Sequence, residues 1–227
     1  MPWKKRSLLK SKLYLILDTQ VNDAAAILRI VRSSLAAGVD IVQLRDKKGS
    51  AKEILALSQK ILKITRSRIP FILNDRVDLA IAAGAEGVHV GQDDLPLSLV
   101  RKMIGAGKIV GVSCQNLKQA KLAEREGADY IGFGSVFKTK TKPERDSLDL
   151  NLLADVVREI KIPVFAIGGI DLDNARRLQR FGVNRFAVCR AICEAKNVQE
   201  ATRKFSEIIT LYRIEGKTNE STARFNS

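Results

Sequence analysis

Eight short apolar runs alternate with amphipathic segments, and this alternation constrains the fold more than any other feature of the chain. The runs occupy residues 13–18, 41–46, 70–75, 87–91, 109–113, 130–135, 163–169 and 185–190. Most are continuously apolar, which is typical of parallel strands buried on both faces. The segments between them have helical spacing, as where Ile54, Leu57 and Ile61 recur. Eight strand–helix units in 227 residues predict an α/β fold, a single (β/α)8 TIM barrel.

Glycines before several strands indicate that one structural unit is reused. Gly38, Gly84, Gly127 and Gly182 each stand where a helix is expected to end, and glycine adopts the left-handed conformation of a helix C-terminus at little steric cost. The alternative is a doubly wound open sheet. That fold usually has fewer strands and a glycine-rich turn after its first strand, whereas the segment "LDTQVND" at 17–23 contains no glycine.

The barrel is expected to occupy residues 13–212 as one domain. Residues 1–12 include the stretch "WKKRSLLKSK" and predict a solvated basic arm. The last helix is expected over about 197–211. The polar residues 213–227 that follow predict a disordered tail.

The net charge and the cysteines limit which partners the protein is expected to bind and in which cellular compartment it is expected to work. The formal net charge is +14, which favours anions such as nucleic acid, anionic lipid or phosphorylated small molecules. Aromatic residues make up only 5% of the chain, which argues against a nucleic-acid interface. The odd set of Cys114, Cys189 and Cys193, without a secretion signal or a spanning apolar run, indicates free thiols in a cytoplasmic protein. We therefore predict no nucleic-acid and no membrane partner, and a homo-oligomer is left open.

Polar residues gather where the predicted strands end. In a barrel of this kind the carboxyl ends of the strands form one active face, so these residues are expected to converge on one mouth. They are Gln43, Arg45, Lys47, Asn74, Asp75, Gln92, Asp93, Asp94, Ser113, Gly168, Gly169 and Arg190, joined by Thr139, Thr141 and Lys142 from the loop at 138–145.

The chemistry of this mouth divides into two halves. Asp75 and Asp94 on neighbouring strands could share one Mg²⁺, which commonly takes one or two carboxylates, waters and phosphate oxygens. The backbone N–H groups of the Gly168–Gly169 pair suit a phosphate, and Arg190 could add a two-pronged contact. Simpler interpretations stay open, because each aspartate could cap the following helix and the glycines could only allow close packing.

Two further interpretations concern general-base and nucleophile chemistry. His89 is the only histidine of the chain and stands among apolar residues in "GVHVG". We interpret it as a packed barrel histidine rather than a general base. We interpret Cys114 as a small residue of the core or the rim.

Six motifs together resemble thiamine-phosphate synthase across residues 13–211. They are "QLRDK", "ND", "GVHVGQDDLP", "GVS", "TKTK" and "AIGGI", which follow the second to the seventh strand in order. The resemblance implies a transferase that joins the diphosphate of an aminopyrimidine, 4-amino-2-methyl-5-hydroxymethylpyrimidine, to a thiazole phosphate. The products would be thiamine phosphate and diphosphate, formed by a Mg²⁺-assisted dissociative displacement that needs no side-chain nucleophile.

The same resemblance implies a role for each site residue. On the pyrimidine side, the diphosphate substrate would be held by Gln43, Arg45, Lys47 and Asn74, and Mg²⁺ would be bound by Asp75 and Asp94. Ser113 would act at the reacting centre, and Lys142 would reach the diphosphate. On the thiazole side, the site would be lined by Thr139 and Thr141, and the thiazole phosphate would be bound by Gly169, Cys189 and Arg190. Of these, Ser113, Lys142 and Arg45 would be catalytic. The chain departs from the family pattern at Gln115, Ser135 and Arg190, where His, Pro and Ser are usual.

Three other functions would share part of this pattern. A thiazole tautomerase-like isomerase of the same superfamily is expected to depart at Lys47, Asp75 and Asp94 and to use a histidine where Gln115 stands. A non-catalytic protein that binds phosphorylated ligands would not need the aspartate pair. A nucleic-acid binder would show steep salt dependence and indifference to Mg²⁺.

Overall fold

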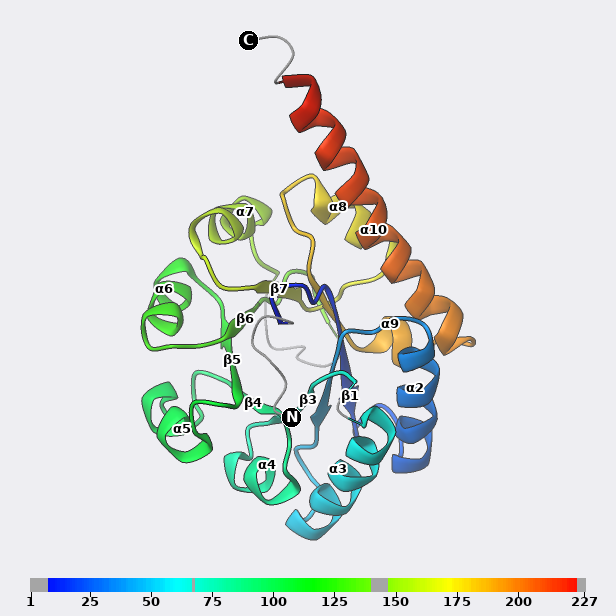
Figure 1. Cartoon of the computed structure of the whole chain (residues 1–227), viewed down its shortest axis with the longest axis vertical. Helices are drawn as coiled ribbons and strands as arrows, with labels where there is room; N and C mark the ends of the chain where they lie inside the picture. Colours follow the sequence, from blue (N-terminus) through cyan, green and yellow to red (C-terminus); the bar gives the residue numbers. More distant parts are fainter. Residues whose placement is uncertain (1–7, 67, 140–146, 224–227) are drawn as a thin grey trace.

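Eight parallel strands close into a barrel and helices surround it, as Figure 1 shows. The structure, a computed structural model, describes residues 8–66, 68–139 and 147–223, with side chains to Leu211. The strands are β1 Leu13–Asp18, β2 Ile41–Arg45, β3 Phe71–Asn74, β4 Gly87–Val90, β5 Ile109–Cys114, β6 Tyr130–Phe133, β7 Val164–Ile167 and β8 Phe186–Val188. Each pairs with the next, and β1 pairs with β8 to close the ring. The predicted (β/α)8 barrel is confirmed.

A helix follows each strand, and four of the helices are followed by the glycines that the sequence predicts there. The helices are α2 Ala24–Ala36, α3 Ala51–Thr65, α4 Val77–Ala83, α5 Leu97–Ile104, α6 Leu117–Arg125, α7 Leu150–Glu159, α8 Leu172–Gln179, α9 Arg190–Cys193 and α10 Val198–Ala223. Gly38, Gly84, Gly127 and Gly182 all have positive φ angles, between 77° and 92°. These glycines therefore hold the left-handed turns expected of them.

The strands divide their side chains between two separate apolar cores. In β1, Leu13, Leu15 and Leu17 belong to the large core between strands and helices, whereas Tyr14 and Ile16 face the interior of the barrel. The period-two alternation of a strand produces this division. A polar side chain on an interior position of any strand therefore points into the barrel or its mouth.

The N-terminal boundary of the barrel needs a correction. Leu8 is buried in the interior core, Ser11 is buried, and the Lys12 side chain donates a hydrogen bond to Asn184 at 2.9 Å. Residues 8–12 thus pack onto the barrel and are not part of a solvated arm, because Leu8 fills the interior below the strands. The remaining residues of the predicted arm, 1–7, lie outside the described residues.

The last helix ends later than the sequence predicts. Helix α10 runs to Ala223 rather than stopping near residue 211 and extends away from the barrel in Figure 1. The segment contains no proline, and its one glycine lowers helix propensity by only about 1 kcal/mol. The helix end is corrected to Ala223, and disorder of the polar tail in solution stays a prediction.

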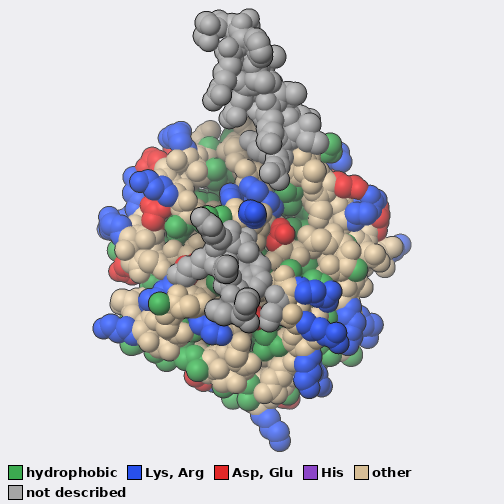
Figure 2. Space-filling view, viewed as in Figure 1, with side chains coloured by type: hydrophobic (Ala, Val, Ile, Leu, Met, Phe, Trp, Pro, Cys, Tyr) green, Lys and Arg blue, Asp and Glu red, His purple; other side chains and the backbone are tan. Residues whose placement is uncertain are grey.

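Lys and Arg outnumber Asp and Glu by 39 to 25 in the whole chain. Figure 2 shows Lys and Arg side chains spread around the face of the barrel, with fewer Asp and Glu. Among the described residues, no helix is both long enough and apolar enough to cross a membrane.

Candidate active site

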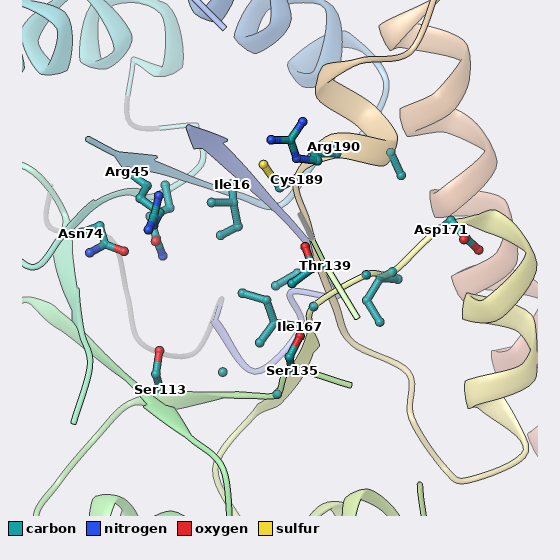
Figure 3. A pocket seen from close by; sticks show the side chains of 18 of the residues that line it. Ile16, Arg45, Asn74, Ser113, Ser135, Thr139, Ile167, Asp171, Cys189 and Arg190 are labelled. Carbon is teal, nitrogen blue, oxygen red and sulfur yellow. The ribbon is translucent and has the colours of Figure 1, made fainter. Parts of the chain in front are cut away.

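A cavity of about 380 Å³ opens at the carboxyl ends of the strands. The predicted site residues that line it are Gln43, Arg45, Asn74, Ser113, Thr139, Gly169, Cys189 and Arg190. Figure 3 shows Arg45, Asn74 and Ser113 on one side of the cavity, while Cys189 and Arg190 approach it from another. The strand ends therefore bring these predicted residues together. Thr141 and Lys142 lie outside the described residues.

Lys47, Asp75 and Asp94 form a charged group next to Asn74. Lys47 makes an ion pair with Asp75. Burial raises the pKa of Asp75 most, the Lys47 ammonium opposes this, and the nearby carboxyl of Asp94 raises the pKa further. Asp94 and Lys47 thus act on the Asp75 carboxyl group in opposite directions.

Neither aspartate caps a helix. The N-cap positions of α4 and α5 are Arg76 and Pro96, and no side chain caps either helix. Asp75 instead has a φ of 60°, a left-handed conformation that costs a non-glycine residue energy and is often found at functional sites. Asp94 accepts a hydrogen bond from the Gly91 N–H at 2.7 Å. The capping interpretation is therefore wrong for both residues.

The donor set fits a magnesium ion bound largely by substrate and water. Within the described residues no group of three or more His, Cys, Asp or Glu side chains is arranged to hold a metal. Two hard carboxylate ligands are nevertheless what Mg²⁺ commonly takes from a protein when phosphate oxygens complete its shell. The raised pKa of Asp75 is also a cost that a bound cation would relieve.

Arg45 is held in place by a residue that the sequence analysis missed. Its Nη1 lies 2.6 Å from Asp18 Oδ2, and the Asp18 side chain is only 1% exposed. Asp18 is the last residue of β1, so the rule that strand ends carry site residues could have identified it. The buried ion pair fixes the guanidinium at the rim of the cavity.

Ser113 and His89 form a pair that the sequence analysis did not expect. Ser113 Oγ lies 2.9 Å from His89 Nε2, and His89 Nδ1 lies 3.0 Å from the hydroxyl of Tyr130. His89 is buried, as predicted, yet it also lines the cavity. The two side chains meet because the inward face of β4 lies beside that of β5, and a hydrogen bond of this kind does not by itself make the pair catalytic.

The Gly168–Gly169 pair serves both close packing and the cavity. Both residues have positive φ angles and line the cavity. A Cβ atom at Gly168 would lie 2.1 Å from Ser135 Oγ, and one at Gly169 would lie 2.6 Å from the Lys138 carbonyl oxygen. Only glycine fits either position, so the packing interpretation and the cavity-lining interpretation hold together.

The opposite wall carries a second ion pair. Arg190 begins α9 rather than ending a strand as predicted, because β8 ends at Val188. Its Nη1 pairs with Glu194, which also lines the cavity. Of the three departures from the family pattern, Arg190 and Ser135 line the cavity and Gln115 does not.

All three cysteines are free, as predicted. Cys114 is buried, and burial raises its pKa to about 12. Cys193 is also buried, and its pKa is raised because its side chain hydrogen-bonds with Cys189 and is removed from water. Neither Cys114 nor Cys193 is therefore a thiolate at neutral pH.

A closed parallel barrel with anion-binding groups at its strand ends defines a (β/α)8 protein suited to phosphorylated small molecules. Residues 13–192 match the family model described as Thiamine monophosphate synthase. The chain belongs to this family.

Known proteins support this assignment over most of the chain. Thiamine-phosphate synthase from Methanobrevibacter smithii is 45% identical over 191 residues, which cover 84% of this chain and 91% of that protein. The protein of the same name from Ruminiclostridium cellulolyticum is 41% identical, with 86% and 94% covered. The solved structure of thiamine phosphate pyrophosphorylase from Pyrococcus furiosus has a TM-score of 0.82 and 35% identity, with 92% of this chain and 98% of that chain covered.

Proposed function

We propose that this chain is a thiamine-phosphate synthase, a transferase of thiamine biosynthesis. It would join 4-amino-2-methyl-5-hydroxymethylpyrimidine diphosphate to a thiazole phosphate and release diphosphate. The observation that carries the proposal is the cavity in which Gln43, Arg45, Asn74 and Ser113 line one side, next to the Asp75–Asp94 pair. A tautomerase or a simple phosphate-binding protein has no use for this aspartate pair.

The pyrimidine diphosphate is assigned to the side of the cavity formed by β2, β3 and β5. Gln43 and Asn74 offer amide groups to the ring, and Arg45 and Lys47 offer cations to the diphosphate. Arg45 is already fixed by Asp18 at 2.6 Å, so little rotamer entropy is lost when the substrate binds. Fixed cations of this kind stabilise charge that develops on a leaving group.

Asp75 and Asp94 would hold the Mg²⁺ ion that the family resemblance implies. When bound, Mg²⁺ supplies positive charge that neutralises the diphosphate. Lys47 pairs with Asp75 and would be released toward the diphosphate as the carboxylates gain a metal. In this way the same three side chains serve both the resting site and the substrate complex.

The chemical step requires orientation rather than a protein nucleophile. The pyrimidine amino group can donate electrons to the exocyclic CH₂ as its C–O bond to diphosphate breaks. Diphosphate takes the electron pair of that C–O bond, and the thiazole nitrogen then uses its own lone pair to form the new C–N bond to the same carbon. Arg45 and Ser113, with Lys142 outside the described residues, are assigned to the leaving group and the reacting centre.

The thiazole phosphate is assigned to the opposite wall. Thr139 and Thr141 would contact the ring, the latter from outside the described residues. Gly169 and the backbone at Cys189 and Arg190 would bind the phosphate. Thr139, Gly169, Cys189 and Arg190 all line the cavity, which supports this assignment. The +14 net charge favours both anionic substrates.

The cellular setting is part of the same proposal. Free cysteines and a biosynthetic role support a cytoplasmic protein. We assign it small phosphorylated substrates and neither a nucleic-acid nor a membrane partner, and we leave a homo-oligomer open.

A coupling assay tests the function. Purified protein, both substrates and Mg²⁺ are incubated, and thiamine phosphate is detected by fluorescence after oxidation to thiochrome. We expect product that requires Mg²⁺ and is lost in Asp75→Ala and Asp94→Ala. Asp93→Ala is the matched control, because Asp93 is exposed beside Asp94 and should retain activity. Product formation in EDTA, or equal activity in all three variants, would contradict the proposal.

A further inference from the structure

A continuous chain of hydrogen bonds crosses the barrel interior and joins two residues of the cavity. It begins at Gln43, whose Nε2 donates to the Tyr14 hydroxyl at 2.5 Å, and the hydroxyls of Tyr14 and Tyr130 are 2.7 Å apart. The Tyr130 hydroxyl is 3.0 Å from His89 Nδ1, and on the other side of the ring His89 Nε2 is 2.9 Å from Ser113 Oγ. Both ends of the chain line the cavity. The middle of the chain is buried in the interior core.

Neighbouring residues leave room for this chain and fix its rings. A Cβ atom at Gly111 would lie 2.1 Å from Tyr130 Cζ, and one at Gly132 would lie 3.3 Å from His89 Cε1. Phe165 packs edge-on against Tyr14 and Tyr130, with ring centroids 5.4 and 5.6 Å away. Small residues on β5 and β6 therefore make space for the rings, and Phe165 limits their movement.

The order of protons along the chain follows from its first donor. Burial raises the pKa of both Tyr14 and Tyr130 far above the ordinary phenol value, so each hydroxyl keeps one proton to donate. Gln43 donates its amide N–H to Tyr14, which leaves the Tyr14 proton for Tyr130. The Tyr130 proton is then directed at His89 Nδ1.

We propose that Gln43, Tyr14 and Tyr130 hold His89 as its Nε2–H tautomer, so that His89 donates to Ser113 and the Ser113 hydroxyl proton is free for the bound substrate. Among the described residues, Ser113 Oγ has no other hydrogen-bond partner. Ser113 is thus a hydrogen-bond donor toward the ligand, and Tyr14, Tyr130 and His89 are positioning residues. A Ser–His pair that generates a nucleophile would have the reverse order, with Nε2 accepting the serine proton.

Only the catalytic consequence of this assignment depends on the proposed function. The donor role of Ser113 would serve the departing diphosphate or the pyrimidine. The tautomer itself is a property of the free protein and is measured without substrate. A failure of the coupling assay and a failure of the proton order are therefore separate results.

Nitrogen NMR of the single histidine tests the proton order. His89 is the only histidine, so protein labelled with ¹⁵N-histidine gives one pair of ring signals. Measured at a pH where the ring is neutral, Nε2 is expected to carry the proton and Nδ1 to be unprotonated. Tyr130→Phe removes the donor to Nδ1 and should shift both signals. Protonation on Nδ1, protonation on both nitrogens, or unchanged signals in Tyr130→Phe would each overturn the assignment.

Kinetics distinguish positioning from packing. Tyr130→Phe and Tyr14→Phe should each lower kcat by about tenfold, the rate equivalent of one lost hydrogen bond, while the KM of the thiazole phosphate stays nearly constant. Phe165→Leu is the packing control, because Phe165 contacts both tyrosine rings without joining the chain. It should keep the Nε2–H tautomer. If Phe165→Leu changed the His89 tautomer and Tyr130→Phe did not, the hydrogen-bond chain would have no positioning role.

Discussion

At the scale of single residues, Asp75 combines a strained backbone with an unfavourable environment for its charge. Its φ of 60° is a left-handed backbone conformation, and its raised pKa shows that the folded site disfavours the charged carboxylate. A carboxyl group whose pKa is higher in the folded than in the unfolded state lowers stability as the pH rises from its unfolded pKa through its folded pKa. Asp75→Asn, which tolerates the same left-handed backbone, should therefore unfold at a higher temperature than the wild type at pH 7 without Mg²⁺. It should also lose activity by about 100-fold or more.

Thermal unfolding across pH, in EDTA and in Mg²⁺, checks this prediction. The advantage of Asp75→Asn should shrink as the pH falls through the raised pKa of the folded state. It should vanish below about pH 3, under the unfolded pKa of about 3.9, where the wild-type carboxyl group is protonated in both states. Added Mg²⁺ should stabilise the wild type more than the variant. Asp93→Asn is the control, because Asp93 is exposed. A variant that is less stable than the wild type at pH 7 would show that the Lys47 ion pair outweighs the cost of burying the carboxylate.

Glu194 makes a second residue-scale prediction, on the thiazole side. It pairs with Arg190 and lines the same cavity, so its charge opposes a phosphate bound there. Glu194→Gln should lower the KM of the thiazole phosphate by about two- to fivefold, the factor given by ~0.5–1 kcal/mol. Glu200→Gln is the control, because Glu200 pairs with Arg203 on helix α10. A higher KM in Glu194→Gln would mean that Glu194 holds Arg190 in its binding position.

Sequence patterns predicted some site residues and missed others. Residues at strand ends, such as Asn74 and Ser113, could be placed because parallel strands end on one face. The Ser113–His89 pair could not be predicted from chain order, because it depends on the register between β4 and β5, in which His89 lies opposite Gly111. Strand alternation gave an unused signal, since His89 and Ser113 both occupy inward positions.

At the scale of elements, helix α3 is the best-defined test of local stability. It begins at a capping box in which Ser50 accepts from the Glu53 N–H and Glu53 accepts from the Ser50 N–H. Ser50→Ala should lower the free energy of unfolding by about 1 kcal/mol and the Tm by about 2–4 °C. Urea denaturation measures this, with Ser98→Ala on the exposed face of α5 as a control that should change little.

The capping box also gives this prediction a pH dependence. The Ser50 hydrogen bonds lower the pKa of Glu53. An acid with a lowered pKa contributes stability above its unfolded pKa and loses it as the pH falls through its folded pKa. The difference between wild type and Ser50→Ala should therefore narrow below about pH 4. An unchanged difference at low pH would show that the Ser50 hydroxyl alone carries the effect.

At the scale of the whole molecule, the alternation of strands and helices was enough to predict the barrel. Eight buried parallel strands have few arrangements that pair the backbone N–H and C=O groups of the edge strands, and a closed barrel is one of them. The ends were less predictable. Leu8 is one apolar residue in a basic stretch, and only the closed barrel provides the interior space that buries it. Helix α9 has four residues, too few for helical periodicity to show in the sequence.

The net charge of +14 gives a last prediction for the molecule as a whole. Between about 0.02 and 0.5 M NaCl the Debye length falls well below the size of the barrel, so long-range attraction of anionic substrates is screened. The KM of both substrates should rise by about threefold to tenfold while kcat stays constant, because screening acts on binding and not on the fixed contacts in the cavity. Neutralising Lys60, Lys63 and Arg66, which line a basic groove between α2 and α3 outside the active site, should weaken this dependence without changing kcat. Steady-state kinetics across the salt series decide the matter, and a kcat that fell in parallel with kcat/KM would place the effect of salt on the chemistry or on the fold instead.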